Sequence, residues 1–210
     1  MSADFFCKRQ KKFAKLFIFY IFGSKLIKWK MVSVLQIASY IFDRYFREYG
    51  KRIDEMKLHK LLYFTQRECI VQTGSPMFPE VFHAYKYGPV MPSIRLLYKQ
   101  NALNQMPDAK VVALYRPIFD EIFKEYAPSN PFTLVAISHA ELSWQRARTG
   151  YSKYQSSDVP MKLDDIIEDA KRYKTRCKML SIQQDFLNSK GISNHEEFVR
   201  TIARTQVPVV

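Results

Sequence analysis

Signals that start and stop helices recur along this chain, and they restrict its fold more strongly than any other feature of the sequence. Ser33, followed by Gln36 three residues later, matches a capping box at a helix N-terminus. Apolar residues then recur at the spacing of one helical face as far as Tyr49. Gly50 stands where a C-terminal cap is expected. The sequence therefore predicts a helix that begins at Ser33 and ends near Tyr49.

Similar signals delimit the later helices. Asp54 is an acceptable N-cap, Gly74 ends the apolar pattern that follows it, and Asn130 caps a helix whose first residue is Pro131. Asp164 and Asp165 lie in the first turn of the helix that begins near 162, where the positive end of the helix dipole is stabilised by acidic side chains. We expect helices at about 54–73, 92–98, 117–126, 131–138 and 162–178, a short one ending at 191, and a last one that begins with the capping box Ser193 to Glu196.

Two short segments favour extended structure. Residues 80–87 contain apolar side chains without helical spacing, and Gly88-Pro89 punctuates them, so we predict a short strand or an extended arm. Residues 110–115 are the candidate for a second strand, and Pro117 is expected to open the helix after it. With no internal repeat and no long linker, the sequence predicts a compact, mainly α domain with at most one small two-stranded β element.

Residues 1–30 differ in composition from the rest of the chain. They hold eight basic residues and one acidic residue, so they carry +7 of the formal charge of +13. Their apolar run, 16–22, is shorter than the roughly 20 residues of a spanning helix, and we expect no transmembrane segment. Three interpretations stay open: a non-native or mis-assigned start with Met31 as the true one, an anchor at a membrane surface, or an ordinary helix. The expected organisation is an extension at 1–30, a domain at 31–175 and a helical tail at 176–210.

The sequence lacks the usual marks of catalysis and of metal binding. Cys7, Cys69 and Cys177 form no CxxC pair, which excludes a zinc site from their spacing and is typical of the reducing cytoplasm. The four histidines are far apart in the sequence, so we expect no metal and no cofactor. No nucleophile elbow, phosphate-binding loop or HExxH pattern is present. We therefore predict a protein that is not an enzyme and has no catalytic residues.

The basic charge raises nucleic acid as a partner. Basic residues on the predicted helices offer phosphate contacts, namely Lys57, Lys60, Arg67, Arg146 and Arg148. However, the chain shows no helix-turn-helix spacing, zinc finger or aromatic RNA-binding motif, and only +6 of its charge lies outside residues 1–30. Nucleic acid is therefore not expected to be the primary partner.

Two stretches of the chain carry a more specific pattern. The first is KLHKLLYF at 57–64, followed by GSPMF at 74–78 and AYKYGPV at 84–90. The second is ISHAELSWQRAR at 137–148. The order and spacing of these motifs, within about 33–173, resemble the Panacea domain, the SocA-like antitoxin family once described as phage-associated proteins of unknown function. One departure is Ser143, since the family often has Pro before the Trp.

The resemblance implies a function in protein binding. Members of the family resemble antitoxins of type II toxin–antitoxin systems, which neutralise a cognate protein toxin by direct contact. Two alternatives stay open: an adaptor that delivers the toxin to a host protease, and a DNA-binding or autoregulatory protein. Because the toxins of the family are varied, the resemblance does not name the toxin.

Candidate contact residues lie in two of the motifs. Gly88 permits backbone angles that other residues avoid, and Pro89 restricts the residue before it, so Tyr87 stands in a rigid turn. Large amphipathic side chains of this kind anchor interfaces, although each of them can instead pack in the core. The candidate protein-binding residues are Lys86, Tyr87, Gly88, Pro89, His139 and Trp144.

Overall fold

The computed structural model describes residues 31–152 and 155–189. The predictions for 1–30, for the short helix end at 191 and for the last helix lie outside these residues. The chain divides into two compact units, Lys28–Arg172 and a second unit made of Met1–Ile27 and Tyr173–Val210. The predicted domain boundaries at 30 and 175 stay predictions.

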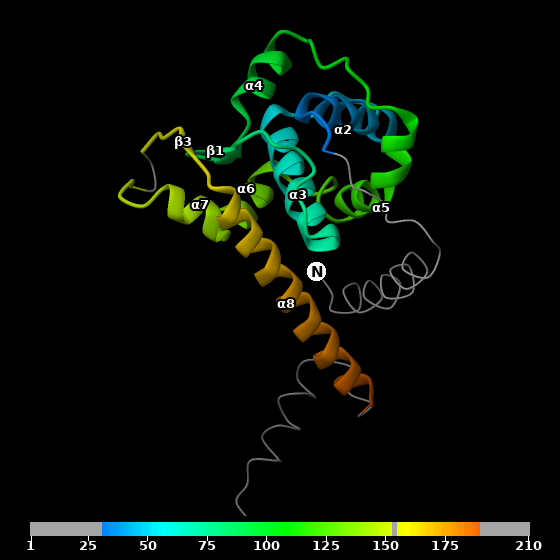
Figure 1. The fold of residues 1–210 in the computed structure, drawn as a ribbon, viewed down its shortest axis with the longest axis vertical. Coiled ribbons are helices and arrows are strands. Elements are labelled where there is room, and N and C mark those ends of the chain that lie inside the picture. The colour runs from blue at the N-terminus through cyan, green and yellow to red at the C-terminus, as the bar shows by residue number, and fades with distance from the viewer. Residues whose placement is uncertain (1–30, 153–154, 190–210) are drawn as a thin grey trace, which may run out of the picture. The chain divides into compact units, whose positions relative to one another are not determined.

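The described residues form a mainly α fold with a small antiparallel sheet, as predicted (Figure 1). The sheet has the order β2-β1-β3, so it contains one strand more than the two expected. Its strands are β1 (His83–Tyr85), β2 (Gly88–Val90) and β3 (Val159–Pro160). The helices are α2 (Val34–Tyr49), α3 (Glu55–Thr73), α4 (Pro92–Lys99), α5 (Ala109–Glu125), α6 (Pro131–His139), α7 (Leu142–Ala147) and α8 (Leu163–Ser189).

Most of the predicted helix ends are confirmed because they depend on local chemistry. Gly50 and Gly74 both adopt the left-handed conformation after their helices, and the Asp54 side chain accepts from the backbone N–H of Lys57. Ser33 is the N-cap of α2, but its hydroxyl accepts from the N–H of Leu35 and not from that of Gln36. The capping residue was therefore predicted correctly, while the geometry of its bond was not.

Helix α3 lies at the centre of the unit Lys28–Arg172. It packs against α2, α5, α6 and β2. In Figure 1, α2, α5 and α6 lie around it. Every residue of α3 from Lys57 to Ile70 is buried, so the helix has no solvent-exposed face along this stretch. A helix buried on all sides must find partners for its polar side chains inside the protein.

The prediction of a strand at 110–115 is wrong, because these residues belong to α5. Asp108 caps that helix by accepting from the N–H of Lys110 at 2.7 Å. Pro117 lies inside α5 and does not open it. The buried face of the helix continues across the proline through Tyr115, Ile118 and Phe119. The burial of apolar side chains before and after Pro117 therefore stabilises the helix by more than the proline destabilises it, which is about 3 kcal/mol in an isolated helix interior.

Helix α8 is longer than the expected 162–178, since it continues to Ser189 without a break. Only its first part, as far as Arg172, belongs to the unit Lys28–Arg172. No helix within residues 31–152 and 155–189 is long and apolar enough to cross a membrane.

Pro117→Ala is expected to raise the free energy of unfolding by about 1 kcal/mol or more, because the new N–H can donate to the carbonyl of Ala113. Chemical denaturation followed by circular dichroism measures the change. Pro131→Ala is the matched control: Pro131 occupies the first turn of α6, where a missing N–H costs nothing, so this change should stay within about 0.5 kcal/mol. Equal effects of the two substitutions would contradict the interpretation of Pro117.

Candidate functional site

Polar side chains of α3, the helix that carries the KLHKLLYF motif, form hydrogen bonds to neighbouring segments of the chain. The Lys57 Nζ donates to the carbonyl of Ala127 at 2.9 Å and to the Tyr45 hydroxyl at 3.2 Å. Gln66 donates to the carbonyl of Phe78 and accepts from the N–H of Met77, at 2.8 and 2.9 Å. The KLHKLLYF helix therefore fixes the GSPMF loop directly.

A second pair of α3 side chains reaches the ISHAELSWQRAR segment. Arg67, which has no exposed surface, forms an ion pair with Glu141 and donates to the Tyr126 hydroxyl at 2.7 Å. The Tyr63 hydroxyl lies 2.9 Å from the Ser143 hydroxyl and donates to Asp169 at 3.2 Å. Residues 59 to 106 positions apart in the sequence are thus joined by buried polar contacts around α3.

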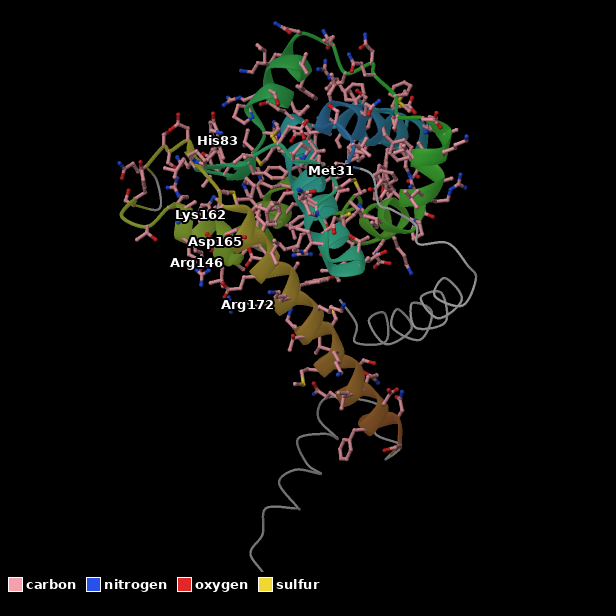
Figure 2. The ribbon with its side chains drawn as sticks, viewed as in Figure 1. Met31, His83, Arg146, Lys162, Asp165 and Arg172 are labelled. Carbon is pink, nitrogen blue, oxygen red and sulfur yellow. The ribbon has the colours of Figure 1, made fainter. Side chains whose placement is uncertain are left out.

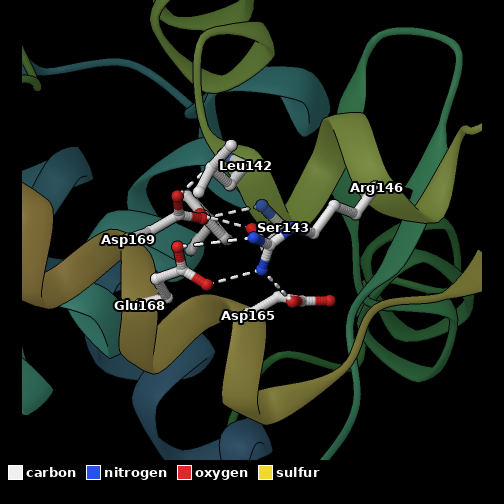
Figure 3. Close-up of polar contacts among 7 residues, drawn as sticks. Leu142, Ser143, Arg146, Asp165, Glu168 and Asp169 are labelled. Atoms are coloured by element: carbon white, nitrogen blue, oxygen red, sulfur yellow. Dashed lines mark hydrogen bonds and ion pairs between the residues drawn. The ribbon is translucent and has the colours of Figure 1, made fainter.

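Asp169 of α8 caps the start of α7 (Figure 3). Its two carboxylate oxygens accept from the backbone N–H groups of Leu142 and Ser143, at 2.7 and 2.9 Å. Helix N-termini carry unpaired N–H groups that favour an anion, and Asp169 supplies one from another helix while remaining 2% exposed. Arg146 lies at the rim of the same contact, beside Asp165, as Figures 2 and 3 show.

Trp144 and His139 support the sheet. The Trp144 indole N–H donates to the carbonyl of Tyr85 at 2.9 Å, and only 8% of Trp144 is exposed. The His139 ring stacks on the Trp144 ring with 3.8 Å between centroids. The Arg148 guanidinium lies 5.2 Å from the centre of the Trp144 ring. Trp144 is therefore mainly a packing residue that fixes β1.

The turn between β1 and β2 presents Lys86 and Tyr87. Tyr87 is 48% exposed, and the Lys86 ammonium lies 5.1 Å from the centre of its ring. Gly88 is buried, with a φ of +94°. A Cβ on Gly88 would lie 2.5 Å from the Ser138 hydroxyl and 2.7 Å from the Cε of Lys60. Gly88 is therefore required both by its backbone angle and by the close approach of two neighbours.

Of the six predicted contact residues, the structure brings two to the surface of the turn. Pro89 is buried with Gly88, and its carbonyl accepts from the Lys60 Nζ at 3.0 Å. His139 is half-buried against Trp144. Lys86 and Tyr87 thus form a tip, while the other four candidates lie beneath it or beside it.

The basic residues offered for phosphate contact are placed unfavourably for that role. Lys57, Lys60 and Arg67 are at most 7% exposed, and Arg148 is 5% exposed. Arg146 is bonded to Asp165 and Glu168. The three basic residues of α3 therefore do not form a solvated face that phosphates could reach.

A cleft of about 730 Å³ lies beside the turn, and sequence reasoning missed it. His59 and Lys60 line it together with Tyr85, Lys86, Tyr87 and Arg95. Burial lowers the pKa of Lys60 to about 7. Burial, with the charges of Lys60 and Arg95, lowers the pKa of His59 to about 3. The available signal was a His-Lys pair inside the apolar pattern of 58–62.

Within the described part of the chain, no group of three or more His, Cys, Asp or Glu side chains is placed to hold a metal ion. The polar residues of the cleft are hydrogen-bond donors, hydroxyl groups and carboxylates, and one of the carboxylates, Glu55, forms an ion pair with Arg95.

The four motif segments are connected through α3, and together they form one helical region against which the β1–β2 hairpin packs. Residues 58–145 of this region match the family model described as "Antitoxin SocA-like, Panacea domain". The resemblance to the Panacea domain is therefore confirmed over these residues. No curated protein and no solved structure matches the chain.

Asp169→Asn should lower the free energy of unfolding by about 2 kcal/mol, because an amide replaces one oxygen that faces a backbone N–H and the charge is lost. Urea denaturation of both proteins measures the loss. Asp165→Asn is the control, since its partner Arg146 has a side chain that is 48% exposed and pairs of this kind contribute less than about 1 kcal/mol. A loss for Asp165→Asn as large as that for Asp169→Asn would refute the capping role.

Because burial lowers the pKa of His59 to about 3, the unfolded chain binds a proton below about pH 6.5 that the folded chain does not. The free energy of unfolding should therefore fall as the pH decreases from 6.5 towards 3, with His59 contributing up to about 1.4 kcal/mol per pH unit. Urea denaturation at pH 6.5, 5.5 and 4.5 measures this slope.

His59→Asn keeps an acceptor for the N–H of Met91 and should reduce the slope, whereas His83→Asn, on the central strand β1, should leave it unchanged. The same pH dependence in both variants would mean that His59 is not the responsible group.

Proposed function

We propose that this protein is an antitoxin of a type II toxin–antitoxin system, which neutralises a cognate protein toxin in the cytoplasm by direct binding and without catalysis. The observation that carries the proposal is the exposed Tyr87 on a turn whose base is fixed. The description of the matching family model as an antitoxin supports this class of function.

The base of the turn is held by two buried contacts. Lys60 donates to the carbonyl of Pro89, and Trp144 donates to the carbonyl of Tyr85. A turn fixed on both strands loses little conformational entropy when it binds. Its tip carries the exposed ring of Tyr87, and tyrosine is one of the residue types enriched at the centre of protein interfaces. We therefore place Lys86 and Tyr87 at the toxin interface.

Binding by occlusion has a consequence that separates it from delivery to a protease. A stoichiometric amount of an occluding antitoxin restores growth in any host, since nothing is consumed or degraded. An adaptor restores growth only where the protease is intact. Rescue of growth in a protease-deficient host therefore supports occlusion.

Tyr87→Ala is expected to impair neutralisation while leaving the fold intact, because Tyr87 is 48% exposed. Loss of an aromatic anchor at the centre of an interface typically costs about 2 kcal/mol, or roughly 30-fold in affinity. Growth rescue in cells that express the cognate toxin, together with titration calorimetry of the purified pair, measures the effect.

Phe46→Ala is the matched control, since Phe46 is a 56% exposed aromatic residue on α2. It should neutralise as well as the parent protein. Normal neutralisation by Tyr87→Ala would place the contact surface elsewhere on the domain. Unfolding of that variant would instead make Tyr87 a packing residue.

A further inference from the structure

The cleft beside the turn has a floor formed by two consecutive residues of α3, His59 and Lys60. Each is 1% exposed. The N-terminal end of α3, the hairpin, Arg95 of α4 and residues 156–158 complete its walls. A volume of about 730 Å³ is large enough for a side chain or a small organic molecule.

The two floor residues present hydrogen-bond donors that are not fully used. His59 accepts from the N–H of Met91 through Nδ1 at 3.3 Å, so its proton is assigned to Nε2. The Nε2 atom is buried and has no hydrogen-bond partner among residues 31–152 and 155–189. Within the same residues Lys60 makes one hydrogen bond, to the carbonyl of Pro89, whereas an ammonium group has three donors. Buried donors of this kind are normally satisfied, so the floor favours an acceptor from a ligand.

The carboxylates around the cleft are engaged elsewhere or lie at its edge. Asp54 caps α3 by accepting from the N–H of Lys57, and Glu55 forms an ion pair with Arg95 at 3.1 Å. Asp158 is exposed at the rim. Among the residues that the structure describes, Lys60 forms no ion pair, and the negative charge of Asp54 only partly offsets the burial that disfavours the charged form of Lys60.

The walls fit a short aliphatic stem above such an anion. Met56 and Val90 contribute apolar surface, and Tyr85 and Tyr87 contribute aromatic surface. Side chains of this type bury methylene groups, while the donors below determine which end group is accepted. A carboxylate satisfies both donors and offsets the charge of Lys60, whereas an amide oxygen offsets no charge.

We propose that the cleft is a binding site for a carboxylate on a short aliphatic chain, with His59 Nε2 and Lys60 Nζ as its donors. Two sources share this chemistry: a glutamate side chain of the protein partner, and a small free dicarboxylate. The first source rests on the proposed function, because Tyr87 belongs both to the tip and to the wall of the cleft.

The test uses the full chain, labelled for NMR, and three probes: the blocked peptide acetyl-Ala-Glu-Ala-amide, its Gln counterpart, and glutarate. The Glu peptide should shift the His59 ring signals and the amide signal of Met91, with an affinity at least tenfold higher than that of the Gln peptide. Glutarate binding tenfold tighter than the Glu peptide supports the site with a free dicarboxylate as its ligand. Absence of shifts with both the Glu peptide and glutarate, or equal affinity for the two peptides, overturns the proposal.

Variants identify the donors. His59→Asn and Lys60→Met should each weaken binding of the Glu peptide at least tenfold, whereas Lys51→Met, at an exposed position before α3, should leave it unchanged. Unchanged binding in His59→Asn overturns the assignment. If Lys60→Met does not fold by circular dichroism, His59→Asn and the comparison of the peptides in the parent protein decide.

This test and that of the proposed function fail separately. Normal neutralisation by Tyr87→Ala together with selective binding of the Glu peptide removes the toxin interface and leaves the carboxylate site standing. Loss of neutralisation in Tyr87→Ala without any carboxylate binding does the reverse.

Discussion

The burial of α3 on all sides from Lys57 to Ile70 is the constraint on which the rest of the domain depends. A helix with no exposed face cannot leave its polar side chains in water, and an unpaired polar group in a protein interior costs about 1–3 kcal/mol. Lys57, Tyr63, Gln66 and Arg67 therefore need partners from other segments. These partners lie after α5, at the start of α7, and in the GSPMF loop, so α3 determines where each of these segments sits.

The sequence was informative wherever structure follows from neighbouring residues. Glycine after a helix and aspartate or asparagine before one act within a few positions, so Gly50, Asp54 and Asn130 were interpreted correctly. Residues 110–115 were misread because Val111 and Val112 favour strands locally, while the packing that makes them helical comes from elsewhere in the fold. Pro117 strengthened that error, since proline is more often found at a helix start than inside a helix.

The position of the turn could be predicted from the sequence, but which of its residues are exposed and which are buried beneath them could not. The rigid turn followed from Gly88 and Pro89, but exposure distinguishes the tip from its support, and exposure depends on the whole fold. The basic residues of α3 were interpreted as a solvated face because the partner of Arg67, Glu141, lies 74 positions away in the sequence. His59 and Lys60 stand out as a polar pair inside an apolar pattern, but that pattern alone does not tell whether such a pair lines a cleft or has partners inside the core.

The close packing of Gly88 against Ser138 and Lys60 divides the hairpin into two parts that differ in how well they tolerate amino-acid substitution. At Gly88 even one added methyl group meets the side chains of Ser138 and Lys60, and the positive φ disfavours any other residue, so a substitution there strains the backbone and displaces both side chains. Lys86 and Tyr87 form the turn between β1 and β2, and neither has a left-handed backbone angle that demands glycine. Other side chains can therefore stand at these two positions on an unchanged scaffold. Under the function proposed above, substitution of these two residues is the change that would redirect the domain to a different partner.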